Sequence, residues 1–163
     1  MHGRSAMSVS ASVHQHLNRK GVNYDLLTHP HSRCSLESAR LARISPKQVA
    51  KGVLTHDGEN YLLCVIPSNH RLSVTWLDKV MHGNFKLVSE HRLGEFFDDC
   101  EIGAIPALGQ VYGLHVIWDE ALVDMDDLYI ESGDHENLIH VSKGGFLELM
   151  GGLQSGTISF PEQ

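Results

Sequence analysis

Residues 52–66 read GVLTHDGENYLLCVI. The dipeptide Asp57-Gly58 is typical of a tight hairpin turn, because aspartate and especially glycine accept the backbone angles that such turns require. Apolar residues of the kind enriched in strands precede this turn at 52–55 and follow it at 61–66. The stretch therefore predicts a β-hairpin.

Short helices and one strand are predicted before the hairpin. The expected elements are a helix through Val9, Val13 and Leu17 that ends at Gly21, a strand ending near Thr28, a helix from Ser35 to Leu41 with Ser35 as its N-cap, and a short helix begun by Ser45-Pro46-Lys47-Gln48. The last of these sequences is a capping-box pattern with proline at the first helical position.

The same mixture continues after the hairpin. The expected elements are a helix from Ser73 to Val80 that buries Trp76 and ends at Gly83, a strand at Phe85–Leu87, a helix from Ser89 to Phe97, a loop at Gly103–Gly109, strands at Val111–Trp118, Leu128–Ile130 and Leu138–Val141, and a helix begun by Ser142. Short strands mixed with short helices predict an α+β domain with a mixed sheet. The chain after Gly151 is expected to fray.

Length and composition favour one globular domain. A chain of 163 residues buries roughly 70% of its extended surface on folding, so it needs no disulfide to hold a core. Its uncharged stretches are far shorter than the ~20 apolar residues of a membrane span, and no membrane association is expected. Three cysteines without a CxxC pair fit a reducing compartment, so we expect a cytoplasmic protein.

The net charge of −7 is unevenly distributed along the chain. Residues 14–92 contain 11 Lys and Arg against 6 Asp and Glu, whereas residues 93–163 contain 1 against 14. Binding of nucleic acid depends on local fields, so this asymmetry permits a weak basic face in the first half. Two solvated faces of different composition would produce the same pattern.

The twelve histidines and three cysteines show no spacing typical of a metal site. The sequence lacks an HExxH motif, a Cys/His quartet and an acidic metal loop, so no metal site is expected. Cys64 lies within an apolar strand and is expected in the core. Cys100 has three acidic neighbours, which raise the pKa of a thiol and lower its reactivity. A Cys/His nucleophile is therefore disfavoured.

Three segments stand apart from the rest. Val49-Ala50-Lys51-Gly52-Val53-Leu54 puts a lysine at the start of an apolar strand, where a surface lysine is the simpler interpretation. The loop Gly103-Ala104-Ile105-Pro106-Ala107-Leu108-Gly109 brackets a proline with glycines, so its backbone amides can line a pocket or form a plain connector. Glu131-Ser132-Gly133-Asp134-His135-Glu136 gathers three acids and a histidine, unless it is an ordinary polar turn.

An ordered series of short motifs runs through the chain. It comprises Tyr24…His29…Ala39, Val49-Ala50-Lys51, Val65-Ile66-Pro67…Arg71-Leu72, Gly103…Pro106…Gly109 and Glu131-Ser132-Gly133. In order and spacing the series resembles the YbaK/prolyl-tRNA synthetase-associated domain, the free-standing or appended editing domain of aminoacyl-tRNA deacylases. The resemblance covers about residues 14–150. Many members carry Pro-Phe-Gly or Pro-Ile-Gly where this chain has Pro106-Ala107-Leu108-Gly109, and the Asp-His-Glu after Gly133 looks like a subgroup feature.

The resemblance implies a fold and an activity together. The fold is a single α+β domain over residues 13–150, with a mixed, curved, barrel-like sheet, flanking short helices and a pocket on one face. A flexible N-terminus (1–12) and a C-terminal tail (151–163) flank this domain. The activity is hydrolytic deacylation of mischarged aminoacyl-tRNA in trans, without a cofactor. The partner is the acceptor end of an aminoacyl-tRNA, and a synthetase as a second partner and the oligomeric state are left open.

In this family the lysine and the backbone of the glycine–proline loop lie against the aminoacyl ester. The resemblance implies that Lys51, Gly103 and Pro106 take these positions here. His135 is added as a water-orienting group, because the ordinary pKa of histidine lies near neutrality. The expected substrate-binding residues are His29, Ala104, Ile105, Gly109, Glu131 and Gly133. Backbone amides can stabilise the developing oxyanion and a ribose hydroxyl of the substrate can assist, so a catalytic triad is not required.

Two other functions compete with this one. A binding module of the same fold would recognise an aminoacyl group, a tRNA end or a small ligand without turnover and regulate another process. A metal- or thiol-dependent hydrolase would need a site that the spacings do not show. Turnover of mischarged tRNA separates the editing enzyme from the binding module, and metal analysis addresses the hydrolase.

Overall fold

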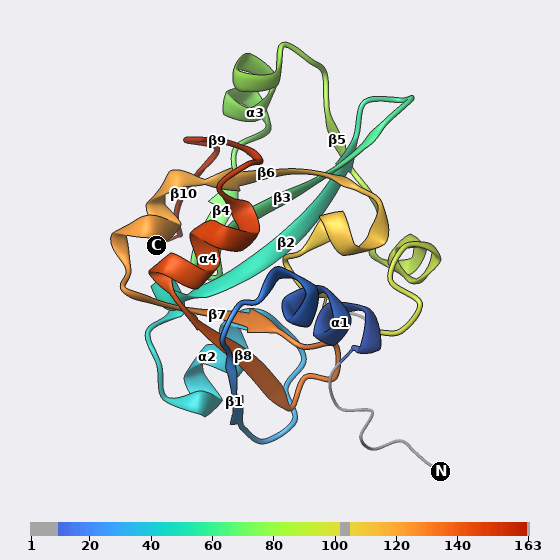
Figure 1. The fold of residues 1–163 in the computed structure, drawn as a ribbon. Helices are drawn as coiled ribbons and strands as arrows, with labels where there is room; N and C mark the ends of the chain where they lie inside the picture. Colours follow the sequence, from blue (N-terminus) through green and yellow to red (C-terminus); the bar gives the residue numbers. More distant parts are fainter. Residues whose placement is uncertain (1–9, 102–104, 163) are drawn as a thin grey trace.

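The computed structural model describes residues 10–101 and 105–162 (Figure 1). Within these residues the main sheet has eight strands and a second sheet has two. The main sheet contains β1 (Asp25–Thr28), β2 (Val49–His56), β3 (Tyr61–Pro67), β5 (Lys86–Leu87), β6 (His115–Asp119), β7 (Asp127–Glu131), β8 (Asn137–Ser142) and β9 (Gln154–Gly156). The second sheet pairs β4 (His70–Leu72) with β10 (Ser159–Pro161).

The main sheet is mixed. Its order is β1-β8-β7-β2-β3-β6-β9, with β5 paired to β2. β2 runs antiparallel to β3 and parallel to β7, and β3 runs parallel to β6. The predicted α+β architecture with a mixed sheet is confirmed. Among the described residues β1 and β9 lie at opposite ends of this order, so the sheet is open and forms no closed barrel.

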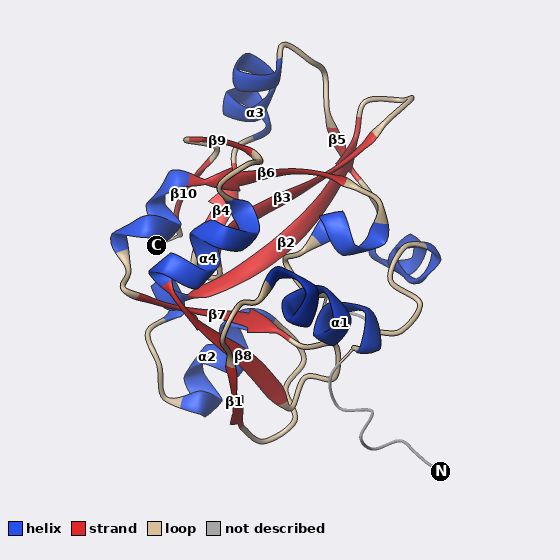
Figure 2. Ribbon diagram, viewed as in Figure 1, coloured by secondary structure: helices blue, strands red, loops and turns tan. Residues whose placement is uncertain are grey.

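Helices cover both faces of this sheet (Figure 2). The α-helices are α1 (Ala11–Lys20), α2 (Ser35–Ala42), α3 (Val74–Met81) and α4 (Lys143–Met150), and the 3-10 helices are η2 (Pro46–Gln48), η3 (Glu90–Glu95), η4 (Gly109–Tyr112) and η5 (Glu120–Asp124). Val13 of α1 and Phe146 of α4 pack with Leu63 of β3 in the main core. The next residue of β3, Cys64, packs with Leu77 of α3 on the other face. β3 is therefore buried on both sides, which explains its unbroken apolar sequence.

The second helix, α2, packs on the same face as α3 but at the other end of β2. Ala39 of α2 forms a separate cluster with Val49 of β2 and Leu138 of β8. This packing places the N-terminus of α2 over the end of β7, where the polar side chains described below are found.

Local sequence signals produced the elements that they predict. Val53 pairs with Cys64 in the β2–β3 hairpin, and Gly58 in its turn has a φ of 99°. Ser45 and Gln48 form the predicted capping box at η2. Ser142 accepts a hydrogen bond from the backbone N–H of Gly145 at the start of α4. These confirmed features all depend on residues close together in the chain.

Several boundaries differ from the predictions. Trp76 is 41% exposed and rests edge-to-face on Phe160 of β10, because only Leu77 among the residues of α3 is fully turned to the sheet. His82 at a φ of 54°, and not Gly83, caps α3, and Cys34, and not Ser35, is the N-cap of α2. The helix predicted from Ser89 is the 3-10 helix η3, and the strand predicted at Val111–Trp118 begins at His115 after η4.

The described residues next to both chain ends are more ordered than predicted. Ser10 caps α1 and is buried, so residues 10–12 belong to the folded domain rather than to a flexible N-terminus. The prediction that the chain frays after Gly151 is wrong. β9 pairs in parallel with β6, β10 pairs with β4, and Ile158 between them is fully buried.

Candidate functional site

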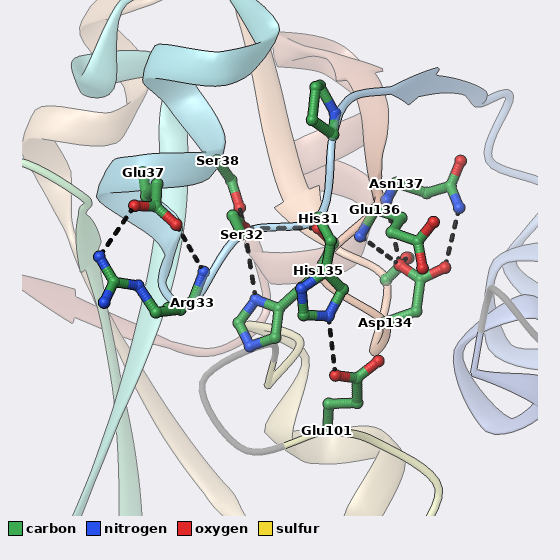
Figure 3. A network of polar contacts seen from close by, with 12 residues as sticks. His31, Ser32, Arg33, Glu37, Ser38, Glu101, Asp134, His135, Glu136 and Asn137 are labelled. Carbon is green, nitrogen blue, oxygen red and sulfur yellow. Dashed lines mark hydrogen bonds and ion pairs between the residues drawn. The ribbon is translucent and has the colours of Figure 1, made fainter.

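Three connecting segments meet beside the end of β7 (Figure 3). The loop after β1 is tied to the β7–β8 turn by two backbone hydrogen bonds, from the N–H of His29 to the carbonyl of Glu136 (2.9 Å) and from the N–H of Ser32 to the carbonyl of His135 (3.0 Å). Glu101, on the segment that leads to the glycine–proline loop, donates its N–H to the carbonyl of Gly133 (2.8 Å). The three segments therefore hold one another in place.

The β7–β8 turn is organised by Asp134. Its Oδ1 accepts hydrogen bonds from the hydroxyl of Ser132 and from the backbone N–H groups of Glu136 and Asn137, and its Oδ2 accepts from the side-chain amide of Asn137. The φ of Gly133 in this turn is 112°, a backbone angle that residues other than glycine rarely adopt. The carboxylate of Asp134 is thus engaged in shaping the turn, as in an ordinary polar turn, but all residues from 131 to 135 are buried.

Glu131 is a buried carboxyl group at the end of β7. Its side chain is 0% exposed, and its Oε2 accepts a hydrogen bond from the hydroxyl of Ser38 on α2 (2.8 Å). Its Oε1 has no hydrogen-bond partner within the described part of the chain. Burial raises the pKa of Glu131 to about 7, although the hydrogen bond from Ser38 and the nearby hydroxyl of Ser35 act to lower it. A carboxyl group in this state is a common feature of functional sites.

His135 lies at the other end of the same polar cluster. It is 2% exposed and has a φ of 60°, an uncommon value for a residue other than glycine. Its Nδ1 lies 3.5 Å from the hydroxyl of Ser32, which is 2.6 Å from the hydroxyl of Ser38. The ring of His31 meets that of His135 edge-to-face and its Nε2 pairs with Glu101 (3.1 Å). The turn and the loop after β1 therefore hold the imidazole of His135 from several sides.

Lys51 lies on the same face of the sheet as Glu131. The neighbouring residues Ala50 and Ile130 pair in register and both belong to the main core, so the residues that follow each of them point to the opposite face. Lys51 is half-buried. Burial lowers its pKa, while Glu162 and the thiol of Cys34 act in the other direction.

The glycine–proline loop is only partly described. Gly103 and Ala104 lie outside the described residues. Ile105 and Pro106 are buried, and Gly109 is packed so tightly that a Cβ there would lie 3.0 Å from side-chain atoms of Leu63. This half of the loop packs into the main core, on the face opposite to Lys51. The sequence analysis expects Lys51 to face this loop. Because residues 102–104 lie outside the described residues, this stays a prediction.

His29 is placed beside the cluster but does not bond to Glu131 or His135. Its side chain is 5% exposed, its Nδ1 lies 2.7 Å from the carbonyl of Pro30, and its buried Nε2 has no partner among the described residues. Ser32, Ser38, His31 and Glu101 are not among the site residues predicted from the sequence. The only local signal for this group is the unusual run His29-Pro30-His31-Ser32.

The profile of the aminoacyl-tRNA editing domain family matches residues 29–149, most of the chain and all three converging segments. The chain belongs to this family. The predicted resemblance is thereby confirmed. No curated protein sequence matches the chain significantly.

Solved structures share the fold of this editing domain. The hypothetical protein APE2540 is 19% identical, with a TM-score of 0.81 over 91% of this chain and 99% of its own. A protein described as a candidate trans-editing enzyme for prolyl-tRNA synthetase is 18% identical, with a TM-score of 0.80 over 99% of this chain and 100% of its own. A candidate signal transduction protein from Marinobacter aquaeolei VT8 is 14% identical, with a TM-score of 0.75 over 91% of this chain and 30% of its own.

Two of the three thiols of the editing domain, those of Cys64 and Cys100, are poorly suited to nucleophilic chemistry. Burial raises the pKa of Cys64 and of Cys100 to about 12 in each case, and Asp99 adds to the effect at Cys100. Cys64 lies in the core as predicted. Among the described residues no group of three or more His, Cys, Asp and Glu side chains is arranged to hold a metal ion. Nor does any helix in the described ranges have the length and apolar character to cross a membrane.

Proposed function

We propose that this editing domain hydrolyses the ester bond of mischarged aminoacyl-tRNA in trans. The observation that carries the proposal is the buried cluster of Glu131 and His135 between three mutually bonded segments, inside the region that matches the editing family. Fold likeness alone would not distinguish an enzyme from a binding module. A buried carboxyl with a raised pKa near a constrained imidazole favours an enzyme.

The chemistry requires little of the protein. An aminoacyl ester is already activated, so a catalyst must position a water molecule, accept its proton and stabilise the developing oxyanion. His135 is the proposed group for the water, and backbone amides of the glycine–proline loop are the proposed oxyanion donors. Lys51 is proposed to bind the ribose or phosphate next to the ester, or to stabilise charge on the ester itself. Hydrolysis adds water across the acyl–oxygen bond and releases a free amino acid and a tRNA hydroxyl.

The surface of α2 is the proposed contact for the acceptor end. Four basic residues are exposed here: Arg33 just before α2, Arg40 on it, and Arg43 and Lys47 in the segment that follows it. Arg40 also lines a pocket of about 510 Å³ whose other lining residues include Cys34 at the start of α2. The thiol of Cys34 acts to raise the pKa of Lys51, which supports a position of this pocket on the side of the lysine. Exposed positive charge on this surface supports the proposed binding of a nucleic-acid backbone. A synthetase is a second proposed partner, because editing in trans acts on a synthetase product.

The test is deacylation of a panel of mischarged tRNAs, followed as release of free amino acid. We expect at least one pair of amino acid and tRNA to be hydrolysed far faster than the spontaneous rate, and correctly charged tRNAs to be spared. Protein with both Glu131→Ala and His135→Ala serves as the inactive control, with circular dichroism to verify folding. Tight binding of an aminoacyl-tRNA without turnover across the panel would contradict the proposal and favour the regulatory binding module.

A further inference from the structure

A surface pocket of about 510 Å³, here called the α2 pocket, is formed by α2 and the segment that leads to η2. It is lined by Cys34, Leu36, Glu37, Arg40, Ile44 and Pro46. Leu36, Ile44 and Pro46 contribute apolar walls, and Glu37 and Arg40 contribute opposite charges 3.8 Å apart. A pocket of this size with apolar walls and few polar groups is typical of sites that hold a small organic group in a fixed orientation.

The carboxylate of Glu37 is held in a fixed position. Its Oε1 accepts a hydrogen bond from the backbone N–H of Arg33 (2.9 Å), and its Oε2 accepts one from the guanidinium of the same residue (3.3 Å) (Figure 3). These hydrogen bonds lower the pKa of Glu37, so the group is ionised at neutral pH. An ionised carboxylate only accepts, and its two oxygens have room for about four hydrogen bonds. Glu37 can therefore accept a further hydrogen bond from an N–H donor in the α2 pocket.

Positive charge is concentrated in the segment that forms the α2 pocket. Residues 33–47 contain four basic residues and one acidic residue, although the whole chain carries a net charge of −7. The side chain of Arg33 is 88% exposed and that of Arg40 is 72% exposed, so both guanidinium groups are accessible to a ligand. Arg43 and Lys47 are exposed as well.

Arg43 occupies a backbone position that suits glycine better. It is the C-cap of α2 and has a φ of 61°. Glycine is the usual residue in this conformation because it has no Cβ. A guanidinium is thus held beside Ile44 of the α2 pocket at a cost in stability, which favours a role for its charge.

These features fit a nucleotide better than an apolar amino-acid side chain or a free anion. An apolar side chain would use the walls alone, and a free anion would use the cations alone. An unpaired nucleotide uses every part, because its base packs on apolar surface, an amino group of the base donates to a carboxylate, and its phosphates pair with Arg and Lys. The acceptor end of a tRNA is the single-stranded sequence CCA, and its terminal adenosine carries the aminoacyl ester.

We propose that the α2 pocket binds the adenine of the 3′-terminal adenosine of tRNA, with the exocyclic amino group donating to Glu37 and the preceding phosphates paired with Arg40 and Arg43. The choice of the terminal adenosine rests on the proposed function, because this nucleotide carries the ester. The thiol of Cys34, which also lines the α2 pocket, acts to raise the pKa of Lys51. This supports a position of the ribose, the proposed ligand of Lys51, beside the bound base.

The test compares two unacylated RNA hairpins that copy a tRNA acceptor stem and differ in one group. One hairpin ends in adenosine, and the other ends in purine riboside, which has the same ring system without the amino group. Binding is measured by fluorescence anisotropy at low salt. We expect the wild type to bind the adenosine hairpin about tenfold more tightly, as a hydrogen bond to a charged group allows. In Glu37→Ala the two hairpins should bind with equal affinity, because the acceptor is absent.

Glu59→Ala is the matched control, because Glu59 is an exposed carboxylate in the turn between β2 and β3. This variant should keep the wild-type ratio of affinities. Comparing two hairpins within each variant removes the general effect of a lost negative charge on RNA binding. A wild type that does not distinguish the hairpins, or a Glu37→Ala variant that still does, would overturn the proposal. Thermal melts verify that each variant is folded.

Leu36→Ser tests the apolar walls. Leu36 is 49% exposed, so the fold should be retained. A third hairpin, which lacks the terminal nucleotide, should bind the wild type more weakly than the adenosine hairpin does, and Leu36→Ser should reduce this difference. A difference that Leu36→Ser leaves unchanged would overturn the proposal. If the same variant then alters which amino acid is removed from mischarged tRNA, the α2 pocket holds the aminoacyl side chain instead.

Arg43→Gly tests the cation beside the α2 pocket. The melting temperature should rise, because glycine accepts the positive φ, and the adenosine hairpin should bind more weakly, because a positive charge is lost. A higher melting temperature with unchanged affinity would contradict the phosphate contact of Arg43.

Binding of unacylated hairpins requires no turnover, so this proposal and the proposed function fail separately. Discrimination of the terminal base without deacylation of any mischarged tRNA would contradict the proposed function and leave the α2 pocket as a nucleotide site. Deacylation by a protein that does not discriminate the terminal base would do the reverse.

Discussion

Lys51 is a half-buried cation on a strand whose neighbouring residues are mainly apolar. Burial disfavours the charged form of Lys51 and lowers its pKa, so this side chain is a poor choice for packing alone. We expect Lys51→Ala to cost the fold less than ~1 kcal/mol, which is within the range of ordinary surface substitutions. If the ammonium binds phosphate or ribose, KM should rise with kcat little changed, and if it stabilises the developing charge, kcat should fall as well.

Lys51→Arg should restore activity only in part, because a planar guanidinium presents its charge differently from a compact ammonium. Single-turnover deacylation by both variants, with thermal melts, measures these effects. Lys79→Ala, on the exposed side of α3, is the matched control for loss of one positive charge. Wild-type rates in Lys51→Ala, or a melting temperature lowered by many degrees, would show that this lysine has no role in the reaction or a structural one.

Only part of the candidate site could be predicted from single residues. Glu131 and His135 belong to the hexapeptide 131–136, whose three acidic residues and histidine mark it as a candidate site in the sequence. Ser32 and Ser38 are unremarkable there, and their importance depends on α2 lying across the end of β7. Asp134, the sequence neighbour of His135, bonds to the turn, whereas the hydroxyl of Ser32, far away in sequence, contacts the imidazole.

At the scale of elements, β8 is tied to both neighbouring strands by one imidazole. Nδ1 of His140 lies 2.6 Å from Asp25 of β1, its Nε2 lies 2.8 Å from Asp127 of β7, and its ring stacks on Tyr129. Hydrogen bonding to Asp127 and Asp25 raises the pKa of His140 above its ordinary value. The folded state therefore holds this proton more tightly than the unfolded state does.

This linkage predicts a pH-dependent stability. The stabilisation from protonated His140 is fully present below the ordinary histidine pKa of about 6.5 and is lost as the pH rises through the higher pKa of the folded state. The difference in melting temperature between wild type and His140→Gln should accordingly be larger at pH 6 than at pH 9. His91→Gln, at an exposed histidine of η3, should show no such change. A difference in melting temperature between wild type and His140→Gln that grows with pH would contradict the stabilising role of protonated His140.

Elements that depend on local signals were predicted well, and elements that depend on distant partners were not. The hairpin turn and the caps of η2 and α4 involve residues within a few positions of one another. β9 and β10 are three residues each, too short to be recognised by pattern. Their position is secured by the buried Asp119, whose Oδ2 accepts from the N–H of Ile158 (3.0 Å) and the hydroxyl of Ser159 (2.7 Å). That interaction spans about forty residues of sequence.

At the scale of the whole molecule, the order of the strands in the main sheet could not be predicted from local sequence patterns. The parallel pairing of β2 with β7 joins Ala50 to Ile130, and it is this pairing that puts Lys51 and Glu131 on one face. The uneven charge, by contrast, was visible in the sequence, and the structure shows where part of it lies. Four basic residues of the first half are exposed just before, on and after α2, the helix that carries Ser38 of the candidate site.

This arrangement predicts weak but localised electrostatic binding of tRNA. Each phosphate neutralised on a single strand contributes about −0.7 to the slope of log K against log salt, so three or four contacts give a slope of about −2 to −3. Arg33 and Arg40 both lie close to Glu37, at 3.3 and 3.8 Å, which reduces the positive field and keeps the expected slope small. Binding of aminoacyl-tRNA by fluorescence anisotropy across a salt series measures it.

Charge reversal at Arg40, Arg43 and Lys47 should weaken binding at low salt and bring the slope close to zero, because these side chains supply most of the contacts. Reversal at Lys79 and Lys86, which are exposed on α3 and β5 and far from α2 in sequence, should leave both affinity and slope near wild type. Net charge becomes more negative in both variants, so a loss of binding confined to the first variant is assigned to the location of the charge. A slope that is insensitive to the first set, or equally sensitive to both sets, would mean that the acceptor end does not bind along α2 and that the basic residues there are simply solvated.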